Sequence, residues 1–249
     1  MATLLRTEQL KKKFGGLVAV DEVDFTLEEG ELHCVIGPNG AGKTTFFNLL
    51  TGGLEPTEGS VYLGDEDIVG LSTREILKRG MARSFQISQL FNGLTVMENI
   101  RMSLLAAKRN QLRPSFALSK LENDEELKRE AYDIADRVNL GDVADQEVSE
   151  LPHGRKRNLE LGVALSTGSQ ILLLDEPAAG LTTEETQELI TLIRDIAEDR
   201  TILLVEHDMK VVMDIAERIT VLHNGRIIAQ GSAEEIQEDE MVKEVYLGE

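Results

Sequence analysis

The sequence lacks the features of a membrane-spanning or disulfide-bonded protein. It has one cysteine and no tryptophan in 249 residues, and no hydrophobic run approaches the roughly 18 residues that cross a bilayer. The single cysteine, Cys34, cannot form an internal disulfide, and the N-terminal segment MATLLRTEQLKKKF has no apolar core of a signal peptide. We therefore expect the chain to be located in the cytoplasm.

Basic residues are also scarce. The chain has 26 lysines and arginines against 45 aspartates and glutamates, which gives a formal net charge of −19 at pH 7. Nucleic acids and anionic membranes require a basic surface, so the charge balance argues against both as main partners. A single anionic ligand held by local geometry remains compatible with this charge.

Hydrophobic residues make up 41% of the chain, which is enough for one large domain. Short apolar runs alternate with helical patterns, and this alternation predicts an α/β fold whose largely parallel sheet is covered by helices. The predicted strands are 17–20, 23–27, 32–36, 61–63, 171–174, 202–205 and 219–222, and the predicted helices include 42–50, 97–109 and 125–139. The dipeptide Asn224-Gly225 predicts a tight hairpin turn. The polar helical block at about 89–155 interrupts the strand pattern as an insertion.

A glycine-rich segment follows the predicted strand 32–36 and precedes a predicted helix. It fits the pattern GxxxxGK(S/T) and consists of Gly37, Pro38, Asn39, Gly40, Ala41, Gly42, Lys43 and Thr44, followed by Thr45. Backbone N–H groups of such a loop surround phosphate oxygens, and the helix N-terminus adds positive charge. In this pattern the lysine reaches the β- and γ-phosphates and the threonine hydroxyl binds Mg²⁺. The segment predicts a nucleoside triphosphate site; a glycine turn with an incidental lysine is the alternative.

A second motif, ILLLDEP, ends a predicted buried strand with two carboxylates. Asp175 closes the apolar run and Glu176 follows it. Ligands of an open parallel sheet bind beyond the carboxyl ends of its strands, so Asp175 can hold the shell of a Mg²⁺ ion there. Glu176 can polarise an attacking water molecule. The alternative is a strand-ending turn without a chemical role.

Three further segments accompany these motifs: RSFQ at 83–86, LPHGR at 151–155 and VEHD at 205–208. In this order and spacing, the sequence resembles the ATPase subunits of ABC transporters along essentially its whole length. The resemblance implies one ABC ATPase domain over 1–249. It implies a RecA-like P-loop NTPase core with an N-terminal antiparallel β subdomain, formed by 1–88 and 156–249, and an inserted α-helical subdomain at 89–155.

The resemblance also implies roles for three residues outside the first two motifs. Gln86 matches the glutamine that senses Mg²⁺ and the attacking water and links the core to the helical subdomain. His207 matches the switch histidine that contacts the γ-phosphate, with a core or loop histidine as the alternative. Phe14 stands where the family has an aromatic residue that stacks on adenine, with a plain core phenylalanine as the alternative.

The segment LPHGR stands where the family has its signature LSGGQ, and it departs from that signature. Pro152 replaces the serine that meets the γ-phosphate, His153 replaces a glycine, and Arg155 replaces a glutamine, whereas Gly154 is kept. We expect the following helix to bind phosphate through its backbone and its N-terminal dipole. The alternative is that the segment only starts a helix. Further along, Thr182 replaces the usual aspartate of the loop that crosses to the partner subunit.

A chain with one phosphate loop and one signature needs a partner, because the family binds each ATP between two subunits. The resemblance implies a second ABC ATPase subunit, identical or similar, and ATP hydrolysis with Mg²⁺ that closes and reopens the pair. It also implies transmembrane permease subunits that dock near Gln86 and the helical block on the cytoplasmic face of the cell membrane. A solute-binding protein would be an indirect partner, and nucleic acid would not be one.

Several stretches of the sequence indicate which class of substrate the transporter carries. FGGLVAVDEVDFTL, LFNGLTVMENI, the LPxG variant and the terminal VYLGE are most similar to the ATPases of branched-chain amino acid importers. Urea and short-chain amide importers and a lipopolysaccharide exporter are close cousins and stay open as alternatives. A soluble ABC ATPase of repair or translation usually has two ATPase units, a long coiled insert or a basic surface. A GTPase or small kinase would lack the signature, the switch histidine and the helical insert in this order.

Overall fold

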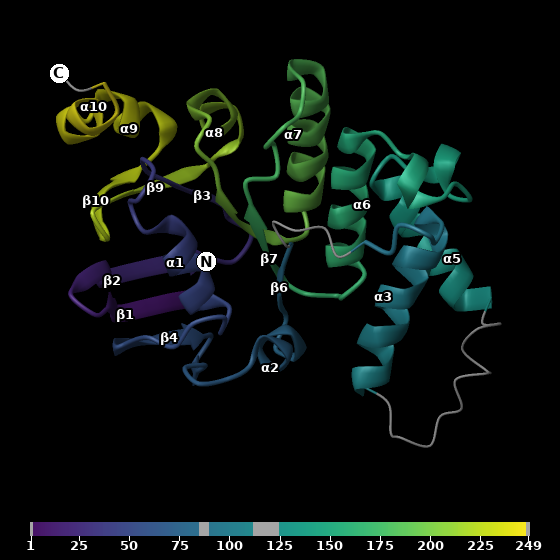
Figure 1. Ribbon diagram of the computed structural model, residues 1–249, viewed down its shortest axis with the longest axis horizontal. Helices are drawn as coiled ribbons and strands as arrows, with labels where there is room; N and C mark the ends of the chain where they lie inside the picture. The colour runs from purple at the N-terminus through teal and green to yellow at the C-terminus, as the bar shows by residue number, and fades with distance from the viewer. Residues whose placement is uncertain (1, 85–89, 112–124, 248–249) are drawn as a thin grey trace.

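The computed structural model describes residues 2–84, 90–111 and 125–247. Two sheets lie side by side, and a group of helices that includes α3, α5 and α6 lies at the opposite end of the molecule from the N-terminal strands (Figure 1). Within the described residues, no helix combines the length and the apolar character that a bilayer span requires.

The larger sheet has six strands in the order β10-β9-β3-β8-β7-β6. Neighbouring pairs from β9 to β6 are parallel, and β10 is antiparallel to β9. The strands are β3 (Leu32–Ile36), β6 (Met81–Arg83), β7 (Ile171–Asp175), β8 (Thr201–Val205), β9 (Arg218–His223) and β10 (Arg226–Gly231). Every residue of β3, β7 and β8 is buried, which explains why these strands are largely apolar, with His33, Asp175 and Thr201 as their polar residues. The predicted parallel sheet and the predicted hairpin at Asn224-Gly225 are confirmed.

The smaller sheet is antiparallel and lies at the N-terminal side. Its order is β2-β1-β4-β5, and its strands are β1 (Thr3–Phe14), β2 (Leu17–Glu28), β4 (Glu58–Leu63) and β5 (Glu66–Asp67). The pair β1–β2 has several register shifts, and Gln9 and Glu22 have the left-handed φ angles 48° and 52°. These bulges break the two-residue alternation. The two strands predicted at 17–20 and 23–27 are therefore one bulged strand, and β1 was missed for the same reason.

Nine helices are present in the described part of the chain. They are α1 (Lys43–Leu50), α2 (Thr73–Lys78), α3 (Val96–Gln111), α5 (Glu125–Arg137), α6 (His153–Leu165), α7 (Thr183–Ala197), α8 (Met209–Ile215), α9 (Ala233–Glu238) and α10 (Glu240–Leu247). Three begin with a capping box, in which a Ser or Thr and a Glu three residues later bind each other's backbone N–H. The pairs are Ser72 with Glu75, Thr182 with Glu185 and Ser232 with Glu235. Thr182 is thus the cap that starts α7.

The core lies on both faces of the larger sheet. Alternate strand residues such as Cys34, Leu174 and Leu204 pack with the cluster that includes residues of α3, α5, α6, α7 and α8. The intervening residues, such as Val35 and Leu203, pack with α1 and the N-terminal sheet. The side chains of a parallel strand alternate between two apolar layers, so the sheet is fixed on both sides.

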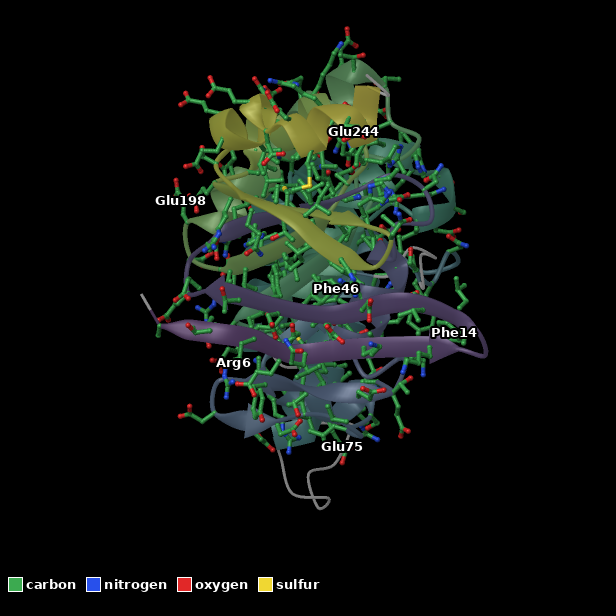
Figure 2. All side chains as sticks on the ribbon, turned by 90° about the vertical axis from the view of Figure 1, so that its left-hand side faces the viewer. Arg6, Phe14, Phe46, Glu75, Glu198 and Glu244 are labelled. Atoms are coloured by element: carbon green, nitrogen blue, oxygen red, sulfur yellow. The ribbon has the colours of Figure 1, made fainter. Side chains whose placement is uncertain are left out.

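Replacement of Phe46 in α1 tests how much the packing between α1 and the N-terminal sheet stabilises the fold. Its side chain is 0% exposed and meets Phe25 of β2 edge to face, with ring centroids 5.5 Å apart. We expect Phe46→Ala to lower the free energy of unfolding by about 3–5 kcal/mol in urea titrations. Phe14→Ala is the matched control, since Phe14 is 45% exposed and lies at the end of the β1–β2 hairpin (Figure 2). The control should lose about 0.5 kcal/mol or less. Equal losses in the two variants would contradict this account of the core.

Candidate nucleotide site

The glycine-rich loop connects the buried end of β3 to the first turn of α1. Gly42 caps α1 with a left-handed φ of 104°, and a Cβ atom at this position would lie 2.3 Å from the carbonyl oxygen of Ala19. The loop is also tied to the β9–β10 hairpin, because the Gly225 N–H donates to the Ala41 carbonyl at 2.9 Å. Its backbone is therefore held from two sides, and only glycine fits between α1 and β2 at position 42.

Lys43 extends its side chain back over this loop. Its Nζ donates to the carbonyl oxygens of Gly37 at 2.6 Å and Pro38 at 3.1 Å, and the residue is only 7% exposed. Burial lowers the pKa of Lys43, and the nearby carboxylates of Glu176 and Asp175 oppose that shift. The ammonium group is thus held against the backbone of the loop that the sequence predicts to bind phosphate.

A cleft of about 560 Å³ opens over the loop. Its lining combines loop residues, an apolar edge of the N-terminal sheet, one carboxylate and the hairpin tip. The lining residues are Phe14, Leu17, Val18, Ala19, Asn39, Gly40, Ala41, Gly42, Lys43, Thr44, Thr45, Glu176 and Asn224. Most of the predicted nucleotide-binding residues therefore share one cleft, and Glu176 shares it with them.

The two neighbouring carboxylates at the carboxyl end of β7, Asp175 and Glu176, have different surroundings. Asp175 is 4% exposed and its Oδ2 lies 2.6 Å from Nη2 of Arg83. The side chain of Glu176 is 29% exposed, its N–H donates to the Val205 carbonyl, and its φ of 47° is left-handed. Non-glycine residues in this conformation are uncommon and cluster at functional sites.

His207 lies next to Glu176 at the neighbouring strand end. Its Nδ1 is 3.7 Å from Oε1 of Glu176, and its side chain is 57% exposed. The structure therefore brings together the two residues that the sequence predicted to act on the γ-phosphate and on water. Parallel pairing of β7 with β8 places them side by side, since Asp175 is paired with Val205.

Glu206, which was not predicted from the sequence, binds the backbone of the segment after β7 and of the segment after β8. This carboxylate is 1% exposed, and it accepts hydrogen bonds from the N–H groups of Ala178 at 3.0 Å and His207 at 3.1 Å. Burial raises the pKa of Glu206, and the backbone donors oppose that shift. The sequence signal for Glu206 was a charged residue inside the motif VEHD, directly after the apolar run 202–205.

Two further residues define the outer part of the cleft. Phe14 is half-exposed in the wall beside Leu17 and Val18, a position that does not fit the alternative of a plain core phenylalanine. Asn224 reaches the cleft from the hairpin tip with a left-handed φ of 49°. The sequence identified Asn224 as a turn residue only, because nothing local shows that the hairpin returns to the loop.

Gly154 lies in a different cleft. It is the second residue of α6 and lines a cleft of about 610 Å³ with Pro152, Arg155, Glu185 and others. Figure 1 shows α6 and α1 on opposite sides of β7 in that view. Within one chain the structure does not bring Gly154 to the phosphate loop.

Arg155, a departure from the signature, is held within the helical part of the chain. Its guanidinium forms an ion pair with Asp142 and donates to the carbonyl of Asn139. The hydrogen bond that Arg155 donates to the Asp142 carboxylate raises the pKa of Arg155. The charge of Arg155 is thus balanced inside its own chain.

Two of the predicted metal-binding residues, Thr44 in the cleft and Asp175 at the end of β7, have side chains that suit Mg²⁺. The Thr44 hydroxyl and the Asp175 carboxylate are hard oxygen donors of the kind that Mg²⁺ prefers. In the described ranges, no three His, Cys, Asp or Glu residues gather in a metal-binding group. Gln86, the third predicted metal residue, lies outside the described residues.

Fold and site together define a P-loop nucleotide-binding protein. Residues 20–179 match the family described as ABC transporter, and residues 226–249 match the family described as branched-chain amino acid ATP-binding cassette transporter. The chain therefore belongs to the ABC transporter family. The predicted resemblance and the predicted fold class are confirmed.

Curated relatives cover nearly the whole chain. It is 42% identical to the high-affinity branched-chain amino acid transport ATP-binding protein LivG of Escherichia coli (strain K12), with 99% of this chain and 98% of the relative covered. It is 41% identical, with the same coverage, to the corresponding protein BraF of Pseudomonas aeruginosa. A probable LivG of Methanocaldococcus jannaschii is 32% identical, again over 99% of this chain and 98% of the relative.

Solved structures agree with the fold. The ADP conformation of MJ1267, an ATP-binding cassette of an ABC transporter, superposes with a TM-score of 0.86 at 30% identity and covers 100% of both chains. A dimeric post-hydrolysis state of the ATP-binding cassette MJ0796, bound to ADP and Pi, has a TM-score of 0.76 at 25% identity. That match covers 92% of this chain and 99% of MJ0796.

Substitutions at Gly40 and Gly42 distinguish two reasons why the loop needs glycine. One is the left-handed backbone conformation, and the other is the lack of room for a side chain. Both have left-handed φ angles, but a Cβ at Gly40 meets nothing within 4 Å, whereas one at Gly42 meets Ala19. Gly40→Ala should lower the free energy of unfolding by about 1 kcal/mol from backbone strain alone. Gly42→Ala should cost about 1–3 kcal/mol more and should weaken binding of a fluorescent ATP analogue. Equal losses of stability in chemical denaturation would show that contact with β2 does not shape the loop.

Proposed function

We propose that this chain is the ATP-hydrolysing subunit of an ABC transporter that imports branched-chain amino acids. One observation carries the proposal: Lys43 is enclosed by the phosphate loop in the cleft that also contains Glu176, in a chain 42% identical to LivG over 99% of its length. The residues of the cleft support ATP hydrolysis, and the similarity to LivG supports a role in amino acid transport.

In the proposed site, the loop N–H groups and Lys43 bind the β- and γ-phosphates of ATP. Thr44 and Asp175, with Gln86, would hold Mg²⁺, which when bound neutralises charge on the phosphate oxygens. Phe14 would stack on the adenine ring at the outer end of the cleft. Its exposed position in the cleft wall supports this assignment.

Glu176 is the proposed general base. It would orient a water molecule and accept its proton as the water oxygen attacks the γ-phosphorus and the bond to ADP breaks. His207 would contact the γ-phosphate and stabilise its developing charge. The 3.7 Å distance between His207 and Glu176 supports a joint action.

A second ABC ATPase subunit, identical or similar, would complete the site. Gly154 at the start of α6 would meet the phosphates bound by the partner chain, so two chains would pair head to tail. Its location in a separate cleft, apart from Lys43, supports this arrangement. The pair of ATPase subunits would close when ATP binds and reopen after hydrolysis, and this movement would drive the transporter.

The motion would reach transmembrane permease subunits on the cytoplasmic face of the cell membrane. An apolar cavity of about 250 Å³ lies between the core and the helical block and is lined by Leu77, Leu90, Phe91 and Val163, among others. Phe91 is 55% exposed, and such a side chain is available to a permease helix. A solute-binding protein would act indirectly, by delivering the amino acid to the permease.

Lys43→Ala should abolish binding of ATP, because the enclosed ammonium is the cation of the phosphate loop. Isothermal calorimetry with magnesium-ATP measures this directly. Lys78→Ala removes an exposed lysine from α2 and is the matched control. If Lys43→Ala keeps micromolar affinity, the phosphate-loop assignment is wrong.

Glu176→Gln should keep ATP binding and slow hydrolysis by about 10²- to 10⁴-fold, because an amide cannot accept the proton of water. ATP that is bound but not hydrolysed should trap the closed pair, visible as a dimer in gel filtration. Glu184→Gln, an exposed carboxylate at the start of α7, should leave turnover unchanged. Wild-type turnover in Glu176→Gln would mean that another group is the base.

The cargo is tested in the cell of origin. Deletion of the gene should abolish high-affinity uptake of radiolabelled leucine, isoleucine and valine and leave urea uptake unchanged. The wild-type gene should restore uptake, and the Glu176→Gln gene should not. Unchanged amino acid uptake in the deletion strain would overturn the cargo assignment while leaving the ATPase assignment intact.

A further inference from the structure

A buried arginine connects the carboxylate of Asp175 to the helix of the phosphate loop. Arg83 is the last residue of β6, and its Nη2 lies 2.6 Å from Oδ2 of Asp175. The side chains are 12% and 2% exposed, so both charges are largely removed from water. The register of β6 with β7 places Arg83 beside Leu173, two residues before Asp175.

The other end of the same guanidinium binds α1. Nη1 donates to Oδ1 of Asn48 at 2.6 Å, and the guanidinium carbon lies 5.9 Å from the ring centroid of Phe47. Asn48 is on the helix that begins with Lys43. One side chain therefore joins three elements that carry the proposed site: α1, β6 and the end of β7.

This arrangement restricts the carboxylate of Asp175. A buried carboxylate without a counter-charge is costly, and a planar guanidinium holds its partner in a defined orientation. With Oδ2 engaged by Arg83, the other oxygen remains the one available to a hydrated metal ion. Partners that orient metal-binding carboxylates in this way typically affect metal affinity or activity by about 10- to 100-fold.

We propose that Arg83 is a positioning residue that orients Asp175 for divalent metal and ties it to the helix of the phosphate loop. The proposal rests on the proposed function, because it concerns the metal of that same site. Arg83 makes no contact with nucleotide in this scheme and acts through Asp175.

The test compares metal binding in matched variants of the full chain. Arg83→Met removes the guanidinium, Arg83→Lys keeps the charge but not the planar donors, and Arg79→Met is the control. Arg79 is an exposed arginine four residues earlier that pairs with Glu66. Mn²⁺ affinity is measured by electron paramagnetic resonance with a non-hydrolysable ATP analogue, and nucleotide affinity is measured separately in EDTA.

Arg83→Met should weaken Mn²⁺ binding by about 10- to 100-fold and leave nucleotide affinity in EDTA unchanged. Arg83→Lys should fall between Arg83→Met and the wild type, and Arg79→Met should match the wild type. In an Asp175→Asn background, Arg83→Met should cause no further loss, because the partner on which it acts is already altered. This double variant also lacks the unpaired buried carboxylate, so it keeps the test valid if Arg83→Met alone fails to fold.

Wild-type Mn²⁺ affinity in folded Arg83→Met would overturn the proposal. An equal loss of nucleotide affinity in EDTA would also overturn it, since Arg83 would then only support the fold of α1. An additive loss in the Asp175→Asn background would show that Arg83 does not act through Asp175. If the wild type itself fails to bind nucleotide, the proposed function fails instead, and the two failures are thus distinguished.

Discussion

The structure depends on the confinement of the phosphate loop between two sheets. The loop leaves the larger sheet at β3, packs at Gly42 against the carbonyl of Ala19 in the smaller sheet, and receives a hydrogen bond from Gly225 of the β9–β10 hairpin. These contacts are made by backbone atoms, so they allow little adjustment. The loop therefore keeps its shape, and Lys43 with it, because two separate β structures meet there.

The parallel register of the larger sheet sets the positions of the side chains at the candidate site. Pairing of β7 with β8 places Glu176, which follows Asp175, beside His207. The buried Glu206 accepts hydrogen bonds from the N–H groups of Ala178 and His207 and so holds the two segments together. On the other side of β7, Arg83 of β6 holds Asp175. The candidate site is thus a row of neighbouring strand ends whose spacing is set by the sheet.

Two separate clefts are the physical basis of the proposed dimer. The cleft over the phosphate loop contains Lys43 and Glu176, and a separate cleft contains Gly154 at the start of α6. Glu185 and Glu188 also line the second cleft, so its charge is not that of a simple phosphate site. A partner's phosphates would have to be bound there by the backbone of α6, and Arg155 is already paired with Asp142.

Local pattern alone determined the parallel sheet, the phosphate loop and the strand-end carboxylates, because apolar runs and glycine spacing reflect short-range backbone geometry. The strand β1 was not predicted, because bulges at Gln9 and Glu22 break the alternation of apolar and polar residues in the β1–β2 pair. Only the tertiary structure decided that Phe14 and Asn224 line one cleft, that Glu206 accepts a hydrogen bond from Ala178, and that Arg83 pairs with Asp175. Arg83 and Asp175 are 92 residues apart in the chain, and their contact follows from the order of strands in the sheet. Such pairs arise from long-range packing, which leaves no periodic signal in the sequence.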